Sequence, residues 1–579
     1  MVFHPPSWVP KLPFSPPDSI PVHEFWADER HGRLPFDRSW NPFTCGVTGK
    51  TYTNREVASR VDFLARALSK KLGWRVNDDT PWDKVLNVFS FNSIDYITAS
   101  FAVHRLNGIS TPANAMYSAS ELEYQLKTSG AKAIITCVPL LDTALKAAKA
   151  AGVKEDHIFL MDVLGFPPPK DSRFKTLDQL IEDGRNEPEL PPLSWAVGQG
   201  ARQVAFLCFS SGTSGLPKAV MIAHRNVISN MMQIRWHEET GRRAKGIETQ
   251  AQMGLLPMSH IYGLVFISLA AMYRGDATFV LPKFELETLL KCVQKNKINF
   301  MHLVPPIIIQ LLKNPELCAK YDLSSLVFIF TGAAPLGAET HEDVERTFPG
   351  LKVGQGYGLT ETSTLVIGSG MNDVMVGTSG SLVPATRAKL LDEEGNEITE
   401  CDKRGELLVQ SPSVTLGYLN NERATTEAFV FDEDGRWMRT GDVAIATKAP
   451  SGNIHFAIVD RLKELIKVKG NQVAPAELEA HLLTHPAVAD CTVIPVPDES
   501  AGEVPKAFVV KAKSHADKPD EEVAREVAKH VEDHKARYKW LKGGIEFIDE
   551  IPKSPSGKIL RRMLRDKEKE SRRAAGAKL

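Results

Sequence analysis

An apolar run in the middle of the chain leads directly into a loop of small and hydroxyl-bearing residues. Val204–Phe209 is continuously apolar, which is typical of a buried strand. The loop supplies four hydroxyls, two glycines and one lysine, in the order Ser210-Ser211-Gly212-Thr213-Ser214-Gly215-Leu216-Pro217-Lys218. Small residues let backbone N–H groups close around a phosphate, and the hydroxyls and the lysine add donors and positive charge. The stretch therefore predicts a phosphate-binding loop.

Two alternatives to this interpretation come from the sequence itself. The loop is not a Walker A motif, because Pro217 precedes the lysine and Ala219 follows it. A plain Ser/Gly surface turn would not need this order of groups after a buried strand. A second stretch, Gly46–Thr51, contains Gly-Lys-Thr, but its glycine spacing is wrong and we expect no apolar strand before it. We therefore interpret 46–51 as a turn.

Composition limits the class of protein. A chain of 579 residues is long for one domain, and 43% hydrophobic with 24% charged residues is typical of a soluble globular protein. The net charge of −1 favours neither a nucleic-acid nor an acidic-membrane partner. The seven cysteines are scattered, odd in number and without a CxxC pair, so we expect neither a disulfide framework nor a zinc site, and a reducing compartment fits.

The N-terminal region and the longest apolar runs give no targeting or membrane signal. Residues 1–42 are rich in proline and lack periodicity, which predicts an extended arm on the surface. Residues 1–21 lack the basic and apolar regions of a secretory signal. The run Leu264–Tyr273 is too short to span a bilayer, so we expect no membrane span.

Strand and helix patterns alternate from residue 85 onward. Ser118 and Glu121 form a capping-box pair, which predicts a helix that ends at Gly130. Such alternation predicts a large α/β region of several layers with mostly parallel sheets. The other predicted elements are a helix at 93–106 and strands at 85–91, 133–137, 157–162 and 326–330, with a turn at 108–112 into a further strand.

Four further motifs lie in order along the chain. They are Gly354-Gln355-Gly356-Tyr357-Gly358-Leu359-Thr360-Glu361, Trp437–Asp442, Val459–Val473 and the lysine-bearing loop Ile551–Ile559. The first differs from a dinucleotide fingerprint, since its third glycine comes one residue early. With Ser210–Lys218, this set resembles the adenylate-forming superfamily of acyl-CoA synthetases, aryl-CoA ligases, luciferases and peptide-synthetase adenylation domains. The resemblance covers essentially the whole chain. It is strongest to the 4-coumarate–CoA ligase group and to fungal phenylacetyl-CoA ligase-like proteins.

The resemblance implies a two-step reaction and a set of nucleotide contacts. A carboxylate attacks the α-phosphate of ATP to give acyl-AMP and pyrophosphate, and a thiol then displaces AMP. The implied catalytic residues are Lys558, His260, Thr360 and Glu361, and the implied magnesium ligands are Glu361 and Thr213. The implied ATP and AMP contacts are Ser210, Ser211, Gly212, Thr213, Ser214, Gly215, Lys218, Gly332, Ala333, Ala334, Gln355, Gly356, Tyr357, Thr360, Asp442 and Arg461. The resemblance implies that Tyr357 stacks on adenine, that Asp442 accepts hydrogen bonds from both ribose hydroxyls, and that Arg461 contacts ribose and phosphate.

The acid pocket follows from the same resemblance. Related enzymes place His260 beside the substrate carboxylate, whereas amino-acid-activating domains carry an Asp near Ile261, which argues here against an α-amino acid. The implied lining is mostly apolar: His260, Ile261, Tyr262, Phe266, Phe330, Ala333, Gly356, Gly358, Thr364 and Leu365. Plant coumarate enzymes often have a smaller residue at the position of Phe266, so a slimmer acid of the phenylacetate type is expected, or a medium-chain aliphatic acid.

A domain boundary is expected near residue 460. The prediction is an N-terminal adenylation domain at 1–460, a hinge at 461–463 centred on Lys463, and a small mobile α+β domain at 464–579. Strands at 490–496 and 507–513 and a helix face of Val523, Val527 and Val531 support it. The implied coenzyme A contacts are Lys283, Lys467, Lys469 and Gly470. The family often has an aromatic residue where this chain has Asn471.

The sequence thus predicts an acid–thiol ligase dependent on ATP and Mg²⁺ that produces an acyl-CoA. One alternative is an adenylating enzyme that passes the acyl group to a separate carrier protein or oxidises the adenylate. The other alternative is a non-catalytic acyl-binding or transport protein. The terminal Ala577-Lys578-Leu579 resembles the address read by the peroxisomal import receptor, which predicts that receptor as a partner and the peroxisome as location, with the cytoplasm as the alternative.

Overall fold

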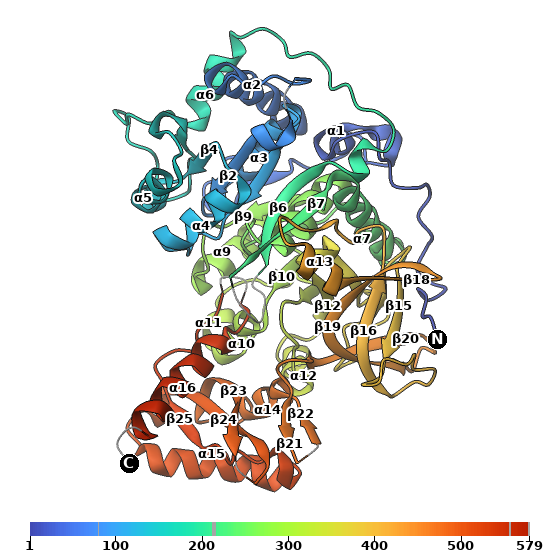
Figure 1. Cartoon of the computed structure of the whole chain (residues 1–579), viewed down its shortest axis with the longest axis vertical. Coiled ribbons are helices and arrows are strands. Elements are labelled where there is room, and N and C mark those ends of the chain that lie inside the picture. Colours follow the sequence, from blue (N-terminus) through green and yellow to red (C-terminus); the bar gives the residue numbers. More distant parts are fainter. Residues whose placement is uncertain (79, 211–215, 470, 499, 555–556, 577–579) are drawn as a thin grey trace.

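The computed structural model of the chain describes residues 1–78, 80–210, 216–469, 471–498, 500–554 and 557–576. Figure 1 shows a large part, residues 1–460, above a small part formed by the red C-terminal end, residues 464–576. Three sheets build the large part and one builds the small part. Within the described residues, no helix combines the length and the apolar character needed to cross a membrane.

The first sheet of the large part has seven strands in the order β17-β7-β6-β3-β2-β4-β5. Strands β6, β3, β2, β4 and β5 are parallel, whereas β7 pairs antiparallel with both β6 and β17. Their bounds are β2 Val85–Phe89, β3 Ile109–Pro112, β4 Ala133–Thr136, β5 Ile158–Leu160, β6 Val204–Ser210, β7 Lys218–Ala223 and β17 Gly417–Tyr418. The strands predicted at 85–91, 133–137, 157–162 and 204–209 are confirmed, with small shifts at their ends. The turn predicted at 108–112 is wrong, because Ile109–Pro112 is itself strand β3 and the described residues 113–118, which lead to α4 (Ala119–Ser129), hold no further strand.

The second sheet has eight strands in the order β1-β9-β8-β10-β11-β12-β13-β14, and its pairings are parallel except β12–β13 and β13–β14. Its strands are β1 Phe43–Cys45, β8 Ala251–Gly254, β9 Ala277–Val280, β10 Phe300–Leu303, β11 Phe328–Thr331, β12 Lys352–Leu359, β13 Thr364–Gly368 and β14 Ser381–Leu382. Strand β1 leads directly into residues 46–51. That stretch is a turn, as predicted, but the expectation that no strand precedes it is wrong.

The third sheet is antiparallel throughout, so the predicted mostly parallel pairing holds only for the first two sheets. Its strands are β15 Arg387–Leu391, β16 Arg404–Gln410, β18 Phe429–Asp432, β19 Gly435–Lys448 and β20 Ile454–Arg461. Strands β19 and β20 pair Asp442 with Arg461. This sheet therefore carries two of the predicted nucleotide contacts side by side.

Helices cover the sheets of the large part. The capping box of Ser118 and Glu121 and the left-handed Gly130 after the helix are both present at α4, as predicted. The helices are α2 Asn54–Leu72, α3 Tyr96–Arg105, α4 Ala119–Ser129, α5 Leu141–Ala151, α6 Leu177–Arg185, α7 His224–Ala244, α8 Ala271–Arg274, α9 Leu286–Asn296, α10 Pro305–Lys313, α11 Pro315–Cys318, α12 Ala338–Thr347 and α13 Glu422–Ala428. A π-helix, η6, spans Tyr262–Ala270 and continues into α8.

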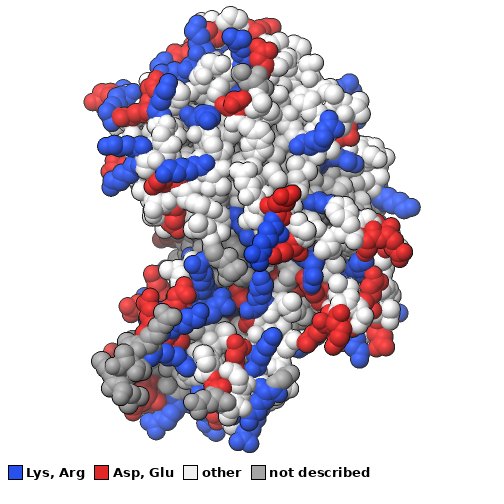
Figure 2. Space-filling view, viewed as in Figure 1, with Lys and Arg blue, Asp and Glu red and all other residues white. Residues whose placement is uncertain are grey.

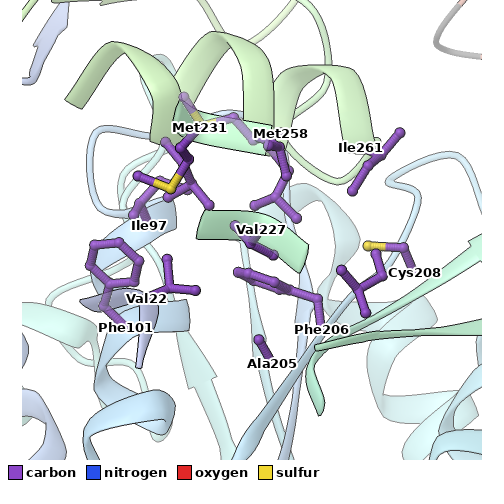
Figure 3. Packing of buried hydrophobic residues seen from close by; sticks show 14 of the residues in the cluster. Val22, Ile97, Phe101, Ala205, Phe206, Cys208, Val227, Met231, Met258 and Ile261 are labelled. Atoms are coloured by element: carbon purple, nitrogen blue, oxygen red, sulfur yellow. The ribbon is translucent and has the colours of Figure 1, made fainter. Parts of the chain in front are cut away.

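One buried cluster fixes the strand that begins the predicted phosphate loop. Figure 3 shows Phe206 of β6 facing Val227 of α7, with Ile261 beside Cys208. Helix α7 contacts β6 and β7 as well as β13 and η6, so it links the first sheet to the second. Burial of each of these apolar side chains stabilises the folded chain by about 1.5–3 kcal/mol. The end of β6 is therefore held firmly in place.

The N-terminal region differs from the surface arm that we expected. Helix α1, Val22–Ala27, buries Val22, Phe25 and Trp26 almost completely. Trp26 lies against Phe36 and Phe101, with ring centroids 5.6 Å and 5.8 Å away. The sequence did not predict this helix, because six residues make fewer than two helical turns and are too few to show a period.

The small part has its own sheet, in the order β22-β21-β24-β23 with β25 beside β24. Its elements are β21 Ile466–Val468, β22 Asn471–Val473, β23 Val488–Asp498, β24 Gly502–Lys511, β25 Ile545–Phe547, α14 Pro475–Leu482, α15 Asp520–His534 and α16 Arg561–Gly576. Val523, Val527 and Val531 are fully buried in a separate core, so the predicted helix face is confirmed. Strand β20 ends at Arg461 and β21 begins at Ile466; the domain limits stay a prediction.

Candidate active site

The first cluster of the site lies where β6 ends and β7 begins. Ser210 and Lys218 face each other across these two strands. The Ser210 hydroxyl and the Tyr418 hydroxyl each donate a 2.9 Å hydrogen bond to Oε1 of Glu361. Lys218 Nζ lies 4.8 Å from the centre of the Tyr418 ring. Burial and the adjacent Glu361 raise the pKa of Tyr418, so its hydroxyl stays a donor.

The second cluster joins the second sheet to the third. The Tyr357 hydroxyl on β12 donates a 2.5 Å hydrogen bond to Oδ2 of Asp442 on β19. Arg461 Nε on β20 lies 3.6 Å from Oδ1 of the same carboxylate. Asp442 is only 5% exposed, and burial raises its pKa although Arg461 opposes the shift. A buried carboxylate held on both sides is suited to accept hydrogen bonds from a diol.

Lys558 reaches these two clusters from the small part. Burial lowers its pKa to about 8, and the nearby Arg461 adds to the lowering. The carboxylates of Glu464, Asp442 and Glu361 act on it in the opposite direction. The loop that carries Lys558 is closed by its own backbone, because the Ser554 N–H donates to the Lys558 carbonyl at 2.8 Å. The Lys558 ammonium therefore lies within electrostatic range of Asp442 and Glu361 of the large part.

His260 belongs to the same group of side chains. Burial lowers its pKa to about 4, and the positive charge of Lys558 adds to the lowering. Its Nδ1 accepts a 3.3 Å hydrogen bond from the Tyr262 N–H. At neutral pH this imidazole is therefore uncharged, and the positive charge beside it comes from Lys558.

Glycines and one strained residue shape the backbone around residues 332–358. A Cβ atom on Gly356 would lie 2.5 Å from the Phe330 ring, and one on Gly358 would lie 1.5 Å from the Thr364 carbonyl oxygen. Ala333 has a φ of +68°, a left-handed conformation that is costly for a residue with a Cβ. The Gln355 side chain holds the following turn, since its Oε1 accepts from Leu336 N–H at 3.0 Å. Gln355 therefore positions this segment.

The predicted acid-pocket residues pack into one layer of rings. Phe266 is 1% exposed, and its ring centroid lies 5.1 Å from that of Phe330 and 5.6 Å from that of Tyr262. His302 completes the layer, 4.8 Å from Phe266, with Nδ1 3.2 Å from the Tyr262 hydroxyl. Thr364, beside Leu365 on β13, donates to the Ile261 carbonyl at 2.9 Å.

Several predicted residues lie away from this group. Lys283, Lys463, Lys467 and Lys469 are exposed. The predicted coenzyme A contacts on the small part belong to the β21–β22 hairpin, whose Gln472 amide bonds to Glu393 of the large part. Residues 211–215 and 470, which include five predicted nucleotide contacts, the metal ligand Thr213 and the coenzyme A contact Gly470, lie outside the described residues.

Besides the Gln472–Glu393 bond, a hydrogen bond and two close backbone approaches lie where the small part meets the large part. Lys313 Nζ at the end of α10 lies 3.3 Å from the Val488 carbonyl oxygen. A Cβ on Gly557 would lie 3.0 Å from Val304, and one on Gly337 would lie 3.1 Å from Cβ of Ala480 on α14. Figure 2 shows Lys and Arg side chains gathered where the large and small parts meet.

Sequence reasoning missed Tyr418 and His302. Tyr418 follows Gly417 in a strand of only two residues, too short for a strand pattern. His302 sits in the apolar strand Phe300–Leu303, where a single histidine gives no signal. Both reach the site only because sheets from distant parts of the chain meet there.

Comparison with known proteins agrees with this geometry. The family described as AMP-binding enzyme matches residues 35–419, and the AMP-binding enzyme C-terminal domain matches residues 477–558. The acyl-CoA ligase easD of Emericella nidulans is 38% identical over 98% of this chain and 100% of its own length. The acyl-CoA ligase AFT1-1 of Alternaria alternata is 40% identical over 98% of this chain and 97% of its own.

A solved structure shares the fold. The anthranilate CoA ligase AuaEII, in complex with anthranoyl-AMP, superposes with a TM-score of 0.78 over 95% of this chain and 97% of its own, at 23% identity. The fold is therefore that of adenylate-forming enzymes, a large N-terminal α/β part with mixed sheets and a smaller C-terminal part. The chain belongs to the AMP-binding enzyme family and, within it, to the acyl-CoA ligases.

Proposed function

We propose that the chain activates an aromatic or medium-chain monocarboxylic acid with ATP and Mg²⁺ and transfers the acyl group to coenzyme A. In the first step a carboxylate oxygen bonds to the α-phosphorus while the bond to pyrophosphate breaks. In the second step the thiol sulfur bonds to the acyl carbon, and AMP leaves with the bonding electron pair. A phenylacetate-type or medium-chain aliphatic acid fits the lining better than a bulkier coumarate-type acid.

The observation that carries this proposal is the approach of Lys558 to Asp442, Arg461 and Glu361. Phosphoryl and nucleotidyl transfer depend mainly on positioning and on stabilising negative charge. With a pKa of about 8, the Lys558 ammonium is mostly charged at neutral pH. It would hold the attacking carboxylate in line and stabilise charge on the α-phosphate. Asp442 would accept the ribose hydroxyls, and Tyr357, whose hydroxyl orients Asp442, would stack on adenine.

Glu361 fits a magnesium site. Its Oε1 accepts two hydroxyl hydrogen bonds, and among the described residues it forms no ion pair, so its charge is available to a cation. Carboxylate and phosphate oxygens are the ligands that Mg²⁺ prefers. The bound ion would neutralise phosphate charge. Ser210 and Tyr418 would orient the carboxylate, and Thr360, next to Glu361, would contact the α-phosphate.

The ring layer favours a slim acid. Phe266, Phe330 and Tyr262 leave an apolar wall with no cationic residue among the predicted lining, so a second carboxylate on the substrate would have no partner. His302 and the Tyr262 hydroxyl bond to each other at the back of this wall. A small aromatic or aliphatic group would pack against these rings, whereas a bulky group would have to displace Phe266.

The test is a panel of carboxylic acids assayed with ATP, Mg²⁺ and coenzyme A, in wild type and Phe266→Ala. The variant should accept bulkier cinnamate-type acids, with preference shifted about tenfold or more, since a pocket contact of methylene size is worth about 1–3 kcal/mol. An unchanged order of preference would mean that Phe266 does not limit the acid. AMP release that does not depend on free coenzyme A would favour transfer to a carrier protein or oxidation of the adenylate instead.

The terminal Ala577-Lys578-Leu579 supports peroxisomal import, and it lies outside the described residues. Removal of the three residues should leave activity intact and shift the protein to the cytosol. Unchanged import would place the address elsewhere in the chain.

A further inference from the structure

Four histidines that the proposed reaction does not use gather on the small part. His481 lies on α14 and His485 just beyond it, four residues apart; His530 and His534, also four apart, lie on α15. Residues four apart on a helix share one face. The rings of His481 and His530 stack with centroids 4.2 Å apart, and His534 lies 5.3 Å from His481. This arrangement packs imidazoles from two elements against one another.

The structure assigns a binding site for a transition-metal ion of the zinc type to His481, His530 and His534. One ring nitrogen from each of the three lies within 4.8 Å of the others. Imidazole nitrogens on one tetrahedral zinc ion lie about 3.4 Å apart, because each Zn–N bond is about 2.0–2.1 Å. The His481 and His530 rings are parallel to within 5°, and imidazole lone pairs lie in the ring plane, so the His530 ring must turn about its side-chain bonds for both rings to face one ion. The absence of a CxxC pair predicted no zinc site, but this one uses histidine alone.

Hydrogen bonds set two of these rings for metal binding. His481 Nε2 lies 3.2 Å from the His530 carbonyl oxygen, and His534 Nδ1 lies 2.8 Å from the same oxygen. A carbonyl only accepts, so both nitrogens carry protons. In the neutral rings, the lone pairs are then on Nδ1 of His481 and Nε2 of His534. Metal-binding histidines in proteins characteristically donate their other N–H to a carbonyl in this way.

The third ring is held by Thr484. His530 Nε2 lies 3.1 Å from the Thr484 hydroxyl, which itself donates to the His481 carbonyl at 2.7 Å. The hydroxyl oxygen therefore accepts from Nε2, and Nδ1 of His530 carries the lone pair. His485 flanks this ring at 5.1 Å, with its own Nδ1 bonded to the Ala487 N–H.

Charges of both signs surround the three rings. Burial, together with the neighbouring imidazoles, lowers the pKa of His481 and of His530. Lys535, whose charge also lowers the pKa of His481, is paired with Glu477 at 3.5 Å. Glu339 on α12 acts on His530 from the large part. His534 is exposed, which gives an ion a path from solvent.

The test is a calorimetric titration in which Zn²⁺ is added to tag-free, chelator-treated full-length protein. The buffer contains excess Mg²⁺ and no ATP. Mg²⁺ prefers oxygen ligands, so it occupies carboxylate sites and leaves imidazoles free. One zinc ion should bind, and His530→Gln and His534→Gln should each weaken binding at least tenfold. His4→Gln, at an exposed histidine outside the group, should change nothing.

Circular dichroism decides which variants enter the comparison. His534 is exposed, so His534→Gln keeps the fold even if His530→Gln does not. Saturating Zn²⁺ should also raise the unfolding temperature of wild type but not of His534→Gln, because a ligand that binds only the folded chain stabilises it. An absence of zinc binding to wild type, or unchanged affinity in folded His534→Gln, would overturn the assignment.

Discussion

Two lysine-bearing segments of the small part, the Lys558 loop and the β21–β22 hairpin, differ in exposure and in their distance from the site. The Lys558 loop reaches among Asp442, Arg461 and Glu361, and burial lowers the pKa of its lysine to about 8. Lys467 and Lys469, on the β21–β22 hairpin, are exposed. The same rigid sheet carries the hairpin, and the loop closes against it through Lys553 and Asp490 of β23. One placement of this body therefore brings one lysine segment to the site and leaves the other outside.

The difference indicates which half of the reaction this arrangement serves. A cation beside the α-phosphate contributes when negative charge builds there, which is the adenylation step. The exposed hairpin would then act only after the small part has turned, with Lys463 in the turn after β20 as the pivot. We therefore expect changes at the two segments to affect different half-reactions.

The largest expected effect is at Lys558. Lys558→Ala should slow ATP-dependent adenylation about 10²–10³-fold, the usual loss when a pre-positioned charge is removed. Thioester formation from supplied acyl-AMP and coenzyme A should stay near normal. The two rates are measured separately as pyrophosphate–ATP exchange and as thioester formation. Equal losses in both would mean that a single arrangement performs both steps.

The pH dependence gives the next effect. The pKa of Lys558 is lowered to about 8, so the charged form is present below that pH and is lost above it. Adenylation should fall up to about tenfold for each pH unit above 8. Lys558→Arg keeps the charge at all these pH values and should remove the fall, whatever its absolute rate. A wild-type profile that stays flat to pH 9.5 would contradict the role of the ammonium.

The smallest expected effect is at the hairpin. Lys467→Ala and Lys469→Ala should each raise the KM for coenzyme A about fivefold or less, since an exposed charge pair contributes at most about 1 kcal/mol. Adenylation should not change. Lys513→Ala, at another exposed lysine of the small part, is the matched control. Slower pyrophosphate exchange in either hairpin variant would place the hairpin in the first step.

The sequence predicted what local chemistry determines. The capping box and glycine of α4, the apolar strand β6 and the valine face of α15 each depend on residues close together in the chain. The alternation of strands and helices likewise predicted the first two sheets. The motif order correctly indicated the acyl-CoA ligase family.

Features set by distant contacts could not be read in this way. The all-antiparallel sheet pairs Asp442 with Arg461, and burial along its 14-residue strand β19 does not alternate from residue to residue. Strand β1 has only three residues. The bond from Tyr418 to Glu361 joins residues 57 positions apart. The pairing of two histidine pairs across α14 and α15 depends on how the helices pack, which no local pattern specifies.

A reversible cross-link between the large and small parts tests whether the small part must turn between adenylation and thioester formation. Gly337 and Ala480 are opposed across the junction, where a Cβ on Gly337 would lie 3.1 Å from Cβ of Ala480, and a shift of a few tenths of an ångström reaches the roughly 3.5–4.5 Å of a disulfide. A Gly337→Cys, Ala480→Cys double variant should therefore oxidise and hold the present arrangement. The reduced enzyme and each single variant serve as controls.

The two half-reactions of the oxidised double variant are then measured side by side. Pyrophosphate–ATP exchange with an accepted acid should continue, because Lys558 remains at the site. Thioester formation from acyl-AMP and coenzyme A should stop and should return when the disulfide is reduced. Full thioester formation in the cross-linked enzyme would contradict the claim that the small part must turn between the two steps.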